Sequence, residues 1–213
     1  MNTIQRTTRL EKTYVYIDGF NLYYGALHGN GSGYKWLNLH SWLSKILKRN
    51  DIEKIKYYTA RVSGKYDSGK PIKQESYFRA LKTLDCVEII EGKFLFNNKR
   101  IRISDDVSLT VKVPEEKGTD VNLAVQLVHD AHAGKFDTAV VVSNDSDLAE
   151  SIRIVANELH LNIGIVSPFQ TFNKQITQYA SFKLPARDGA IMSSQFPSVL
   201  NDGIGKFAKP SGW

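Results

Sequence analysis

The chain has 213 residues, of which 42% are hydrophobic and 23% charged, as expected for one globular α/β domain. No apolar run approaches the ~20 residues that a membrane span requires, so we expect no membrane partner. The first 12 residues are polar and basic and lack the apolar stretch of a signal peptide. Cys86 is the single cysteine, which excludes an intramolecular disulfide and disfavours a cysteine-built zinc site. These features favour a cytoplasmic protein.

The charge balance is mildly basic. The formal net charge is +6 at pH 7, and the sequence pI is about 9.2. Such a balance suits a polyanionic partner such as nucleic acid. It favours that partner only slightly over an ordinary solvated surface, because many unrelated proteins share it.

The first elements follow a polar leader. We expect residues 1–12 to form this flexible leader, 13–17 a strand, 19–24 a short helix and 29–33 a flexible glycine-rich loop. The spacing of apolar residues predicts an amphipathic helix over 38–49. One face of this helix carries Leu39, Trp42, Leu43, Ile46 and Leu47.

The middle of the chain is predicted to alternate strand, helix and strand. A strand is expected over 52–62, a helix from Pro71 to about Thr83, and a strand over 87–90. Residues 93–113 are predicted to form short antiparallel strands around an Asn97-Asn98 turn, extending the edge of the sheet. Their expected bounds are 94–96, 100–103 and 109–113.

The last elements complete an α/β pattern. A helix is predicted over 118–133, with Val121, Ala124, Val125, Val128 and Ala131 on its core face. The valine-rich stretch 138–142 is apolar on both faces, as in a central parallel strand. Further elements are expected as helices over 147–159 and 172–179 and strands over 162–166 and 182–184. The alternation predicts an α/β fold with a parallel sheet, a domain over 13–184 and a tail over 185–213.

Three acidic clusters are the most informative feature of the sequence. They lie within residues 14–21, 116–124 and 140–148. The first and third follow apolar strands, and open α/β sheets bind ligands at the carboxyl ends of their strands. If the strands 14–17 and 138–142 are neighbours, Asp18, Asp145 and Asp147 converge. Converging carboxylates repel one another, so a hard divalent cation is the natural counter-charge.

Each cluster also has a purely structural explanation. Asp18-Gly19 is good turn chemistry, Asp120 suits the first turn of a helix, and one residue of 144–147 is expected to cap the next helix. The combination of three clusters nevertheless favours a shared acidic pocket. Such a pocket, holding Mg²⁺ or Mn²⁺, supports metal-assisted hydrolysis of phosphodiester bonds.

The three motifs resemble those of the NYN domain family, LabA-like proteins related to PIN-like metal-dependent nucleases. They are Asp18 to Asn21 (DGFN), residues 117–124 (KGTDVNLA) and residues 143–148 (SNDSDL). Their order and their placement after strands and at helix starts agree with the family, and the resemblance covers about residues 13–167. It implies a three-layer α/β/α sandwich with a central, mainly parallel sheet. It also implies Mg²⁺ or Mn²⁺ as cofactor and RNA, rather than DNA, as the commonest substrate.

The resemblance assigns roles position by position. The catalytic and metal-binding residues, as direct or water-mediated ligands, would be Asp18, Asp120, Asp145 and Asp147. Asn21, Ser143 and Asn144 would contact the substrate or orient the acids. At one position the chain departs from the pattern: many relatives carry a further Asp six residues after the equivalent of Asp120, and here that residue is Gln126.

Two other functions stay open. The Gln126 departure is consistent with a non-catalytic nucleic-acid-binding or scaffold module, and the same sheet edge suits a nucleotide or phosphate ligand. Basic side chains could hold phosphates, although a solvated surface explains them as well; they are Lys65, Lys70, Lys73, Lys93, Lys99, Arg100 and Arg102.

Aromatic side chains after the first motif could stack on unpaired bases or pack in the core; they are Tyr23, Tyr24, Tyr34 and Trp36. Phe196 and Trp213 are apolar anchors in the polar tail. They are expected to dock on the same subunit or on another one, and a homo-oligomer is therefore possible.

Overall fold

The computed structural model describes residues 10–29, 33–65, 67–102 and 108–213, except for the side chains of 94–99 and 112–116. Most of the predicted leader, the centre of the 29–33 loop and the side chain of Lys99 lie outside this description. Seven strands form the main sheet in the order β4-β3-β2-β1-β5-β6-β7. Their bounds are β1 Glu11–Asp18, β2 Asn50–Ala60, β3 Val87–Arg102, β4 Ser108–Lys117, β5 Thr138–Val142, β6 Asn162–Ser167 and β7 Phe182–Pro185.

Six of these strands run parallel, and β4 alone is antiparallel to its neighbour β3. The predicted contact between the first strand and the valine-rich strand is confirmed. β1 pairs with β5 in parallel, from Thr13 opposite Thr138 to Ile17 opposite Val142. The five residues of β5 are all buried, as expected for a strand covered on both faces. The carboxyl ends of β1 and β5 therefore lie next to each other.

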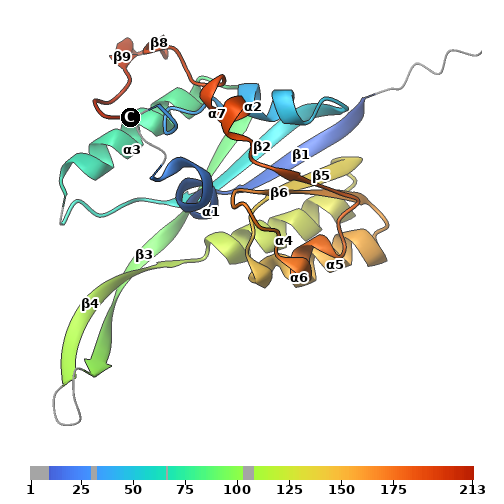
Figure 1. Ribbon diagram of the computed structural model, residues 1–213, viewed down its shortest axis with the longest axis horizontal. Coiled ribbons are helices and arrows are strands. Elements are labelled where there is room, and N and C mark those ends of the chain that lie inside the picture. Colours follow the sequence, from blue (N-terminus) through green and yellow to red (C-terminus); the bar gives the residue numbers. More distant parts are fainter. Residues whose placement is uncertain (1–9, 30–32, 66, 103–107) are drawn as a thin grey trace, which may run out of the picture.

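Helices cover both faces of the sheet and give the three-layer α/β/α sandwich that the resemblance implied (Figure 1). One face packs against α1 Gly19–Leu22, α2 Leu39–Ile46, α3 Gly69–Lys82 and α7 Asp188–Met192. The other face packs against α4 Thr119–His132, α5 Ala149–Arg153 and α6 Lys174–Thr177. Helical segments of other types extend these helices: η1 Tyr23–Leu27, η2 Ser146–Leu148 and η3 Ile154–Glu158.

The buried face of α4 differs from the prediction. Ala131 is buried and Ala124 and Val128 pack against the core as expected, but Val121 and Val125 are 65% and 62% exposed, and Leu123 and Leu127 are buried in their place. The helix is rotated because Asp130 is also buried, at 1% exposure, where it pairs with groups beneath the helix. A pattern of apolar residues alone places such an acid on the solvent face.

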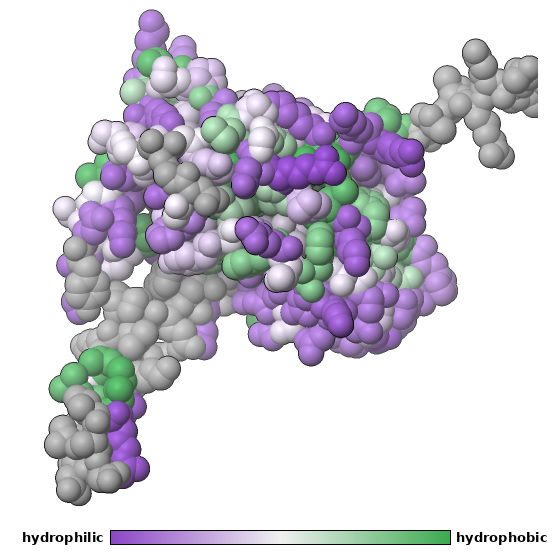
Figure 2. Space-filling view, viewed as in Figure 1, coloured by the Kyte–Doolittle hydropathy of each residue, from purple (hydrophilic) through white to green (hydrophobic). Residues whose placement is uncertain are grey.

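Strands β3 and β4 form one long ribbon instead of several short strands around a turn at Asn97-Asn98. The backbone of β3 continues through both asparagines. Ten successive pairs join it to β4, from Lys93 opposite Lys117 to Arg102 opposite Ser108. This uninterrupted ladder outweighs the preference of asparagine for turns. We call residues 93–102 and 108–117 the arm, which projects from the body and carries a small hydrophobic patch (Figures 1 and 2).

The C-terminal segment folds back on the domain. After α7 it forms a two-stranded hairpin of β8 Val199–Asn201 and β9 Lys206–Ala208. The ring of Trp213 lies 6.4 Å from that of Trp36 and 5.8 Å from that of Tyr77, and Phe196 lies 5.9 Å from Trp36. Both predicted anchors thus dock on the same chain. Within the described residues, no helix is both long and apolar enough to cross a membrane.

Candidate metal centre

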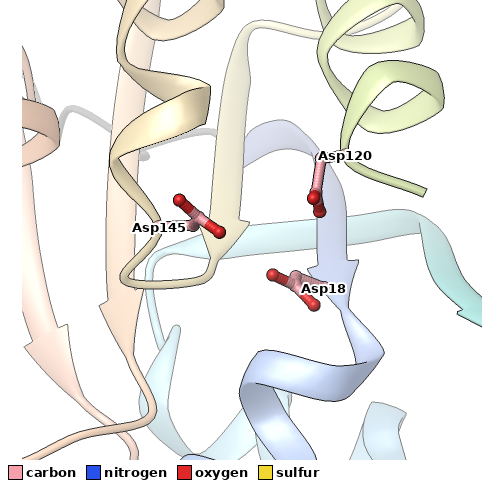
Figure 3. Close-up of side chains that lie close together, drawn as sticks. All are labelled: Asp18, Asp120 and Asp145. Carbon is pink, nitrogen blue, oxygen red and sulfur yellow. The ribbon is translucent and has the colours of Figure 1, made fainter. Parts of the chain in front are cut away.

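Three aspartates from separate parts of the chain meet at the carboxyl edge of the sheet (Figure 3). Asp18 ends β1, Asp120 lies in the first turn of α4, and Asp145 follows β5. One carboxylate oxygen from each lies within 4.8 Å of the others. Asp18 is buried and the other two are half-buried. The structure thus brings together three of the four acids that the sequence suggested as metal ligands.

The position of Asp18 is fixed by the start of α1 and by close packing behind it. Its Oδ1 accepts a hydrogen bond of 2.9 Å from the backbone N–H of Asn21, so it caps the helix. A Cβ atom on Gly19 would lie 2.6 Å from the carbonyl oxygen of Tyr58 and 2.8 Å from the Tyr57 ring. Only glycine allows the chain to turn so close to the end of β2. The carboxylate is therefore held against the sheet edge.

Ser143 connects two of the three acids. Its Oγ donates a hydrogen bond of 3.1 Å to Oδ2 of Asp18 and accepts one of 3.1 Å from the backbone N–H of Asp145. The residue is completely buried. Of the two roles that the resemblance left open, these contacts favour orienting the acids over contacting substrate.

Three asparagines hold the loops around the acids: Asn21, Asn144 and Asn173. The sequence analysis did not identify Asn173 as one of them. The backbone N–H of Asn144 donates to Oδ1 of Asn21 at 2.9 Å. The backbone N–H of Asn173 donates to Oδ1 of Asn144 at 2.7 Å, and its side-chain amide donates to the Asn144 carbonyl at 3.2 Å. The available sequence signal for Asn173 is that it caps α6. The loops after β1, β5 and β6 are thereby linked into one unit.

Asp147 lies outside the group of three carboxylates. It is exposed, and its backbone N–H donates a hydrogen bond of 3.0 Å to Oδ1 of Asp145. Its observed contact thus orients Asp145. A role of its carboxylate at the metal, through a bridging water, stays a prediction.

The Gln126 position belongs to a buried polar network under α4. Oε1 of Gln126 accepts hydrogen bonds of 3.0 Å from both Lys56 Nζ and the Tyr58 hydroxyl. Lys56 Nζ also lies 2.5 Å from Oδ2 of Asp130, which accepts a further hydrogen bond of 2.9 Å from the Tyr16 hydroxyl. Sequence reasoning missed this network because its members lie on β1, β2 and α4, far apart in the chain.

Electrostatics near the site follow from burial and from these partners. Burial raises the pKa of Tyr57, and the nearby carboxylate of Asp18 raises this pKa further, so the phenol stays protonated. Burial also raises the pKa of Asp130, but hydrogen bonds from Lys56, Lys135 and Tyr16 outweigh it and hold this pKa below its usual value. Asp130 is therefore ionised, and Lys56 and Lys135 balance its charge.

The three converging carboxylates fit a hard divalent cation. Carboxylate oxygens are preferred ligands of Mg²⁺ and Mn²⁺, and a few of them leave coordination positions for water and substrate. Burial of Asp18 strengthens the attraction between the acids and a cation, because screening by water is weaker there.

The profile of the NYN domain matches residues 12–183. The chain belongs to the NYN domain family. This match contains the strands and loops that carry the three acids. The motif resemblance, which rested on three short segments, is thereby confirmed over most of the chain.

Two similar proteins add to this placement. The chain is 31% identical over 238 residues to 6-hydroxy-3-succinoylpyridine 3-monooxygenase HspA of Pseudomonas putida (strain DSM 28022 / S16), covering 95% of this chain and 75% of that protein. It also resembles the crystal structure of a protein of unknown function from Vibrio parahaemolyticus RIMD 2210633, with a TM-score of 0.58 and 15% identity. That match covers 84% of this chain and 94% of the other, and it supports the fold alone.

Proposed function

We propose that this NYN domain protein is a cytoplasmic, metal-dependent nuclease that hydrolyses phosphodiester bonds. Its proposed main substrate is RNA. The observation that carries the proposal is the convergence of Asp18, Asp120 and Asp145 within 4.8 Å at the carboxyl edge of the sheet. The family placement supports the nuclease class, and the net charge of +6 suits a polyanionic substrate.

In this proposal Asp18, Asp120 and Asp145 hold one Mg²⁺ or Mn²⁺, and Asp147 contributes through a water molecule. A bound cation of this type supplies an activated water and neutralises charge on the phosphate. Ser143 keeps the carboxylate of Asp18 and the loop of Asp145 in a fixed relation. Gln126 is neutral and is occupied by Lys56 and Tyr58, so we place a single cation in the site.

The test is cleavage of a labelled mixed-sequence single-stranded RNA and of its DNA counterpart, each with Mn²⁺, Mg²⁺ or EDTA. We expect metal-dependent cutting of RNA that falls at least about 100-fold in Asp145→Asn, since the cation loses a direct ligand. Asp147→Asn should lower the rate less than Asp145→Asn. Asp85→Asn is the matched control, because Asp85 is an exposed acid just before the opposite end of β3.

Circular dichroism and thermal unfolding establish that each variant is folded. Equal cutting by the parent and Asp145→Asn would show that the acidic site is not the catalytic centre. Binding of RNA by the parent without cutting under any divalent ion would instead support a non-catalytic nucleic-acid-binding module.

A second function is favoured by one observation, the 31% identity to a pyridine-ring monooxygenase over 95% of this chain. A monooxygenase transfers one atom of O₂ to its substrate and reduces the other to water with electrons from a cofactor such as a reduced nicotinamide or flavin. The all-carboxylate site fits it less well, since oxygen-activating iron is typically held by two histidines and one carboxylate. The test is O₂ consumption and hydroxylated product with 6-hydroxy-3-succinoylpyridine and a reduced nicotinamide.

A further inference from the structure

We propose that Tyr23, Tyr24 and His28 form a binding site for a planar heteroaromatic ring next to the acidic site. Their rings contact one another in a closed group of three. The centroids of Tyr23 and Tyr24 lie 5.2 Å apart, those of Tyr23 and His28 5.4 Å, and those of Tyr24 and His28 5.7 Å. Lys35 adds a positive charge, with Nζ 5.6 Å from the centroid of Tyr23.

Packing in the core accounts in part for Tyr23, which is half-buried against it, but not for Tyr24 and His28. Trp36, which the sequence analysis grouped with these aromatics, is completely buried, and Tyr34 packs against the core. Tyr24 is 62% exposed and His28 is exposed. A large aromatic side chain that leaves most of its surface in water beside a candidate catalytic site is a candidate for ligand contact.

The backbone places this group at the same sheet edge as the acids. Tyr23 begins η1, and only the four residues of α1 separate it from Asp18. Tyr24 follows Asp18 by six residues, which corresponds to about 9 Å along a helix. Figure 3 shows this helix leading away from Asp18. π-Helical segments such as η1 are frequent at functional sites.

Close packing at Gly25 fixes the orientation of η1. A Cβ atom there would lie 2.8 Å from Cβ of Pro168 and 2.9 Å from the ring of Phe169. Both residues follow directly after β6, so η1 rests against the loop at the carboxyl end of that strand. The buried side chains of Leu22 and Leu27 hold the segment from below. The exposed rings are therefore presented by a rigid support.

The chemistry of the group suits an unpaired nucleobase. Bases stack on tyrosine and histidine, and a nearby lysine attracts the phosphate that accompanies each base. The assignment of the ring as a nucleobase next to the scissile phosphate rests on the proposed nuclease function. The pyridine ring in the name of the similar monooxygenase has the same planar, heteroaromatic character. Ring stacking itself therefore does not depend on which reaction the site performs.

The experiment measures binding of a fluorescent single-stranded RNA by anisotropy in the Asp145→Asn background, which prevents cutting. Tyr24→Leu, which keeps an apolar side chain but removes the ring, should weaken binding about tenfold. Tyr24→Phe, which keeps the ring, should bind within about twofold of the Asp145→Asn parent. An abasic nucleotide is placed at each position of the RNA in turn. At one position it should weaken binding to the Asp145→Asn parent, and in Tyr24→Leu the same abasic RNA should bind as well as the intact RNA.

Calorimetric titration of the parent and of Tyr24→Leu with 6-hydroxy-3-succinoylpyridine distinguishes the two kinds of ring, a nucleobase and a small-molecule pyridine. Weakened binding of RNA supports a nucleobase, and weakened binding of the pyridine alone supports a small-molecule ring at this site. Equal binding of both ligands by parent and Tyr24→Leu overturns the ring site. If the protein still cuts RNA in that case, the nuclease proposal stands without it.

Discussion

The hydroxyl of Ser143 illustrates how much of the acidic site depends on single side chains that bind no ligand themselves. It donates to Asp18 and accepts from the backbone of Asp145, so it relates the ends of β1 and β5. Groups that hydrogen-bond to metal ligands typically change metal affinity or activity by about 10- to 100-fold when removed. Ser143 is therefore a positioning residue in the proposed site.

Ser143→Ala is expected to weaken Mn²⁺ binding by about tenfold, because the carboxylate of Asp18 loses one of its fixed partners. Isothermal titration with Mn²⁺ measures this directly. Ser151→Ala is the matched control, since Ser151 is also buried and its Oγ donates to a backbone carbonyl, that of Leu148, at 2.9 Å. Unchanged Mn²⁺ affinity in Ser143→Ala would mean that the backbone alone positions the acids.

Single residues differ in how far the sequence could predict them. Asp18 and Asp145 were predictable because Asp18 ends one apolar strand and Asp145 closely follows another, the valine-rich strand expected at the centre of the sheet. Lys56 was not, because a lysine in a strand is normally solvated and its partners lie 70 and 74 residues away. A buried ion pair requires that the tertiary contact is known before either member can be placed.

At the scale of elements, α4 connects the acidic site to the interior. Its first turn carries Asp120, its middle carries Gln126 and its last turn carries Asp130, and both Gln126 and Asp130 bind Lys56 of β2. Breaking a buried ion pair by removing one partner leaves an uncompensated charge and costs about 3–5 kcal/mol. The network is thus expected to fix the rotation of the helix and the direction of Asp120.

Asp130→Asn is expected to lower the free energy of unfolding at pH 7 by about 3 kcal/mol. The variant should also show a shallower loss of stability in acid. The pKa of Asp130 in the folded protein lies below that in the unfolded chain, about 3.9. Below about pH 4 the unfolded state therefore binds more protons, and the parent loses this stabilisation as the pH falls through the folded pKa.

Urea unfolding of parent and Asp130→Asn between pH 3 and pH 7 measures both effects. Asp85→Asn, at an exposed acid, should follow the parent at every pH. Parallel curves for the parent and Asp130→Asn would show that Asp130 titrates alike in the folded and unfolded states.

The same helix shows where pattern reasoning fails for elements. The apolar residues of α4 are spread widely enough that two faces are plausible, and the buried Asp130 selects the one that leaves Val121 exposed. The turn expected at Asn97-Asn98 was wrong because a ten-pair ladder overrides local preference. By contrast, α2 kept its predicted face, because Leu39, Trp42 and Leu43 define a single apolar stripe.

At the scale of the whole molecule, the C-terminal segment completes the core on the α3 side. Arg79 binds Asp202 at 2.8 Å and lies 4.2 Å from the centroid of Phe207. The hydrogen bonds from Arg79 lower the pKa of Asp202 to about 2. Trp213 adds its ring to those of Trp36 and Tyr77. Composition alone could not reveal this docking, because a few anchors in a polar segment suffice for it.

Trp213→Ala is expected to lower the free energy of unfolding by about 2 kcal/mol, less than the ~3–5 kcal/mol of a completely buried ring. Trp213→Phe should restore about half of the loss, because it keeps an aromatic partner for Trp36. Chemical denaturation measures both. Stability equal to the parent in Trp213→Ala would indicate that the end of the segment is only loosely attached.

The arm projects from the body and is joined directly to the acidic site (Figure 1). Its strand β4 ends at Lys117, three residues before Asp120. Arg100 and Arg102 are exposed and, being two residues apart in a strand, share one face. Ile101 and Leu109, 46% and 53% exposed, face each other across the ribbon on the opposite face. The two arginines lie at the far end of the arm from Lys117, where they could hold the backbone of a long single strand that reaches out from the proposed site.

Arg100→Ala together with Arg102→Ala is expected to weaken binding of a 20-nucleotide single-stranded RNA and to reduce its salt dependence. Each phosphate contact contributes about 0.7 to the slope of log K against log salt for single strands, so the slope should fall by about 1.4. Binding of a four-nucleotide RNA should not change, because ten residues of strand span about 33 Å, or roughly ten stacked nucleotides.

The control is Lys48→Ala together with Arg49→Ala, which removes the same charge from exposed residues beside the start of β2. Affinities measured over a series of salt concentrations separate the two variants. A slope reduced equally by both would show that the arm acts only through net charge. A slope reduced by the arm variant alone would establish that long substrates lie along the arm on their way to Asp18, Asp120 and Asp145.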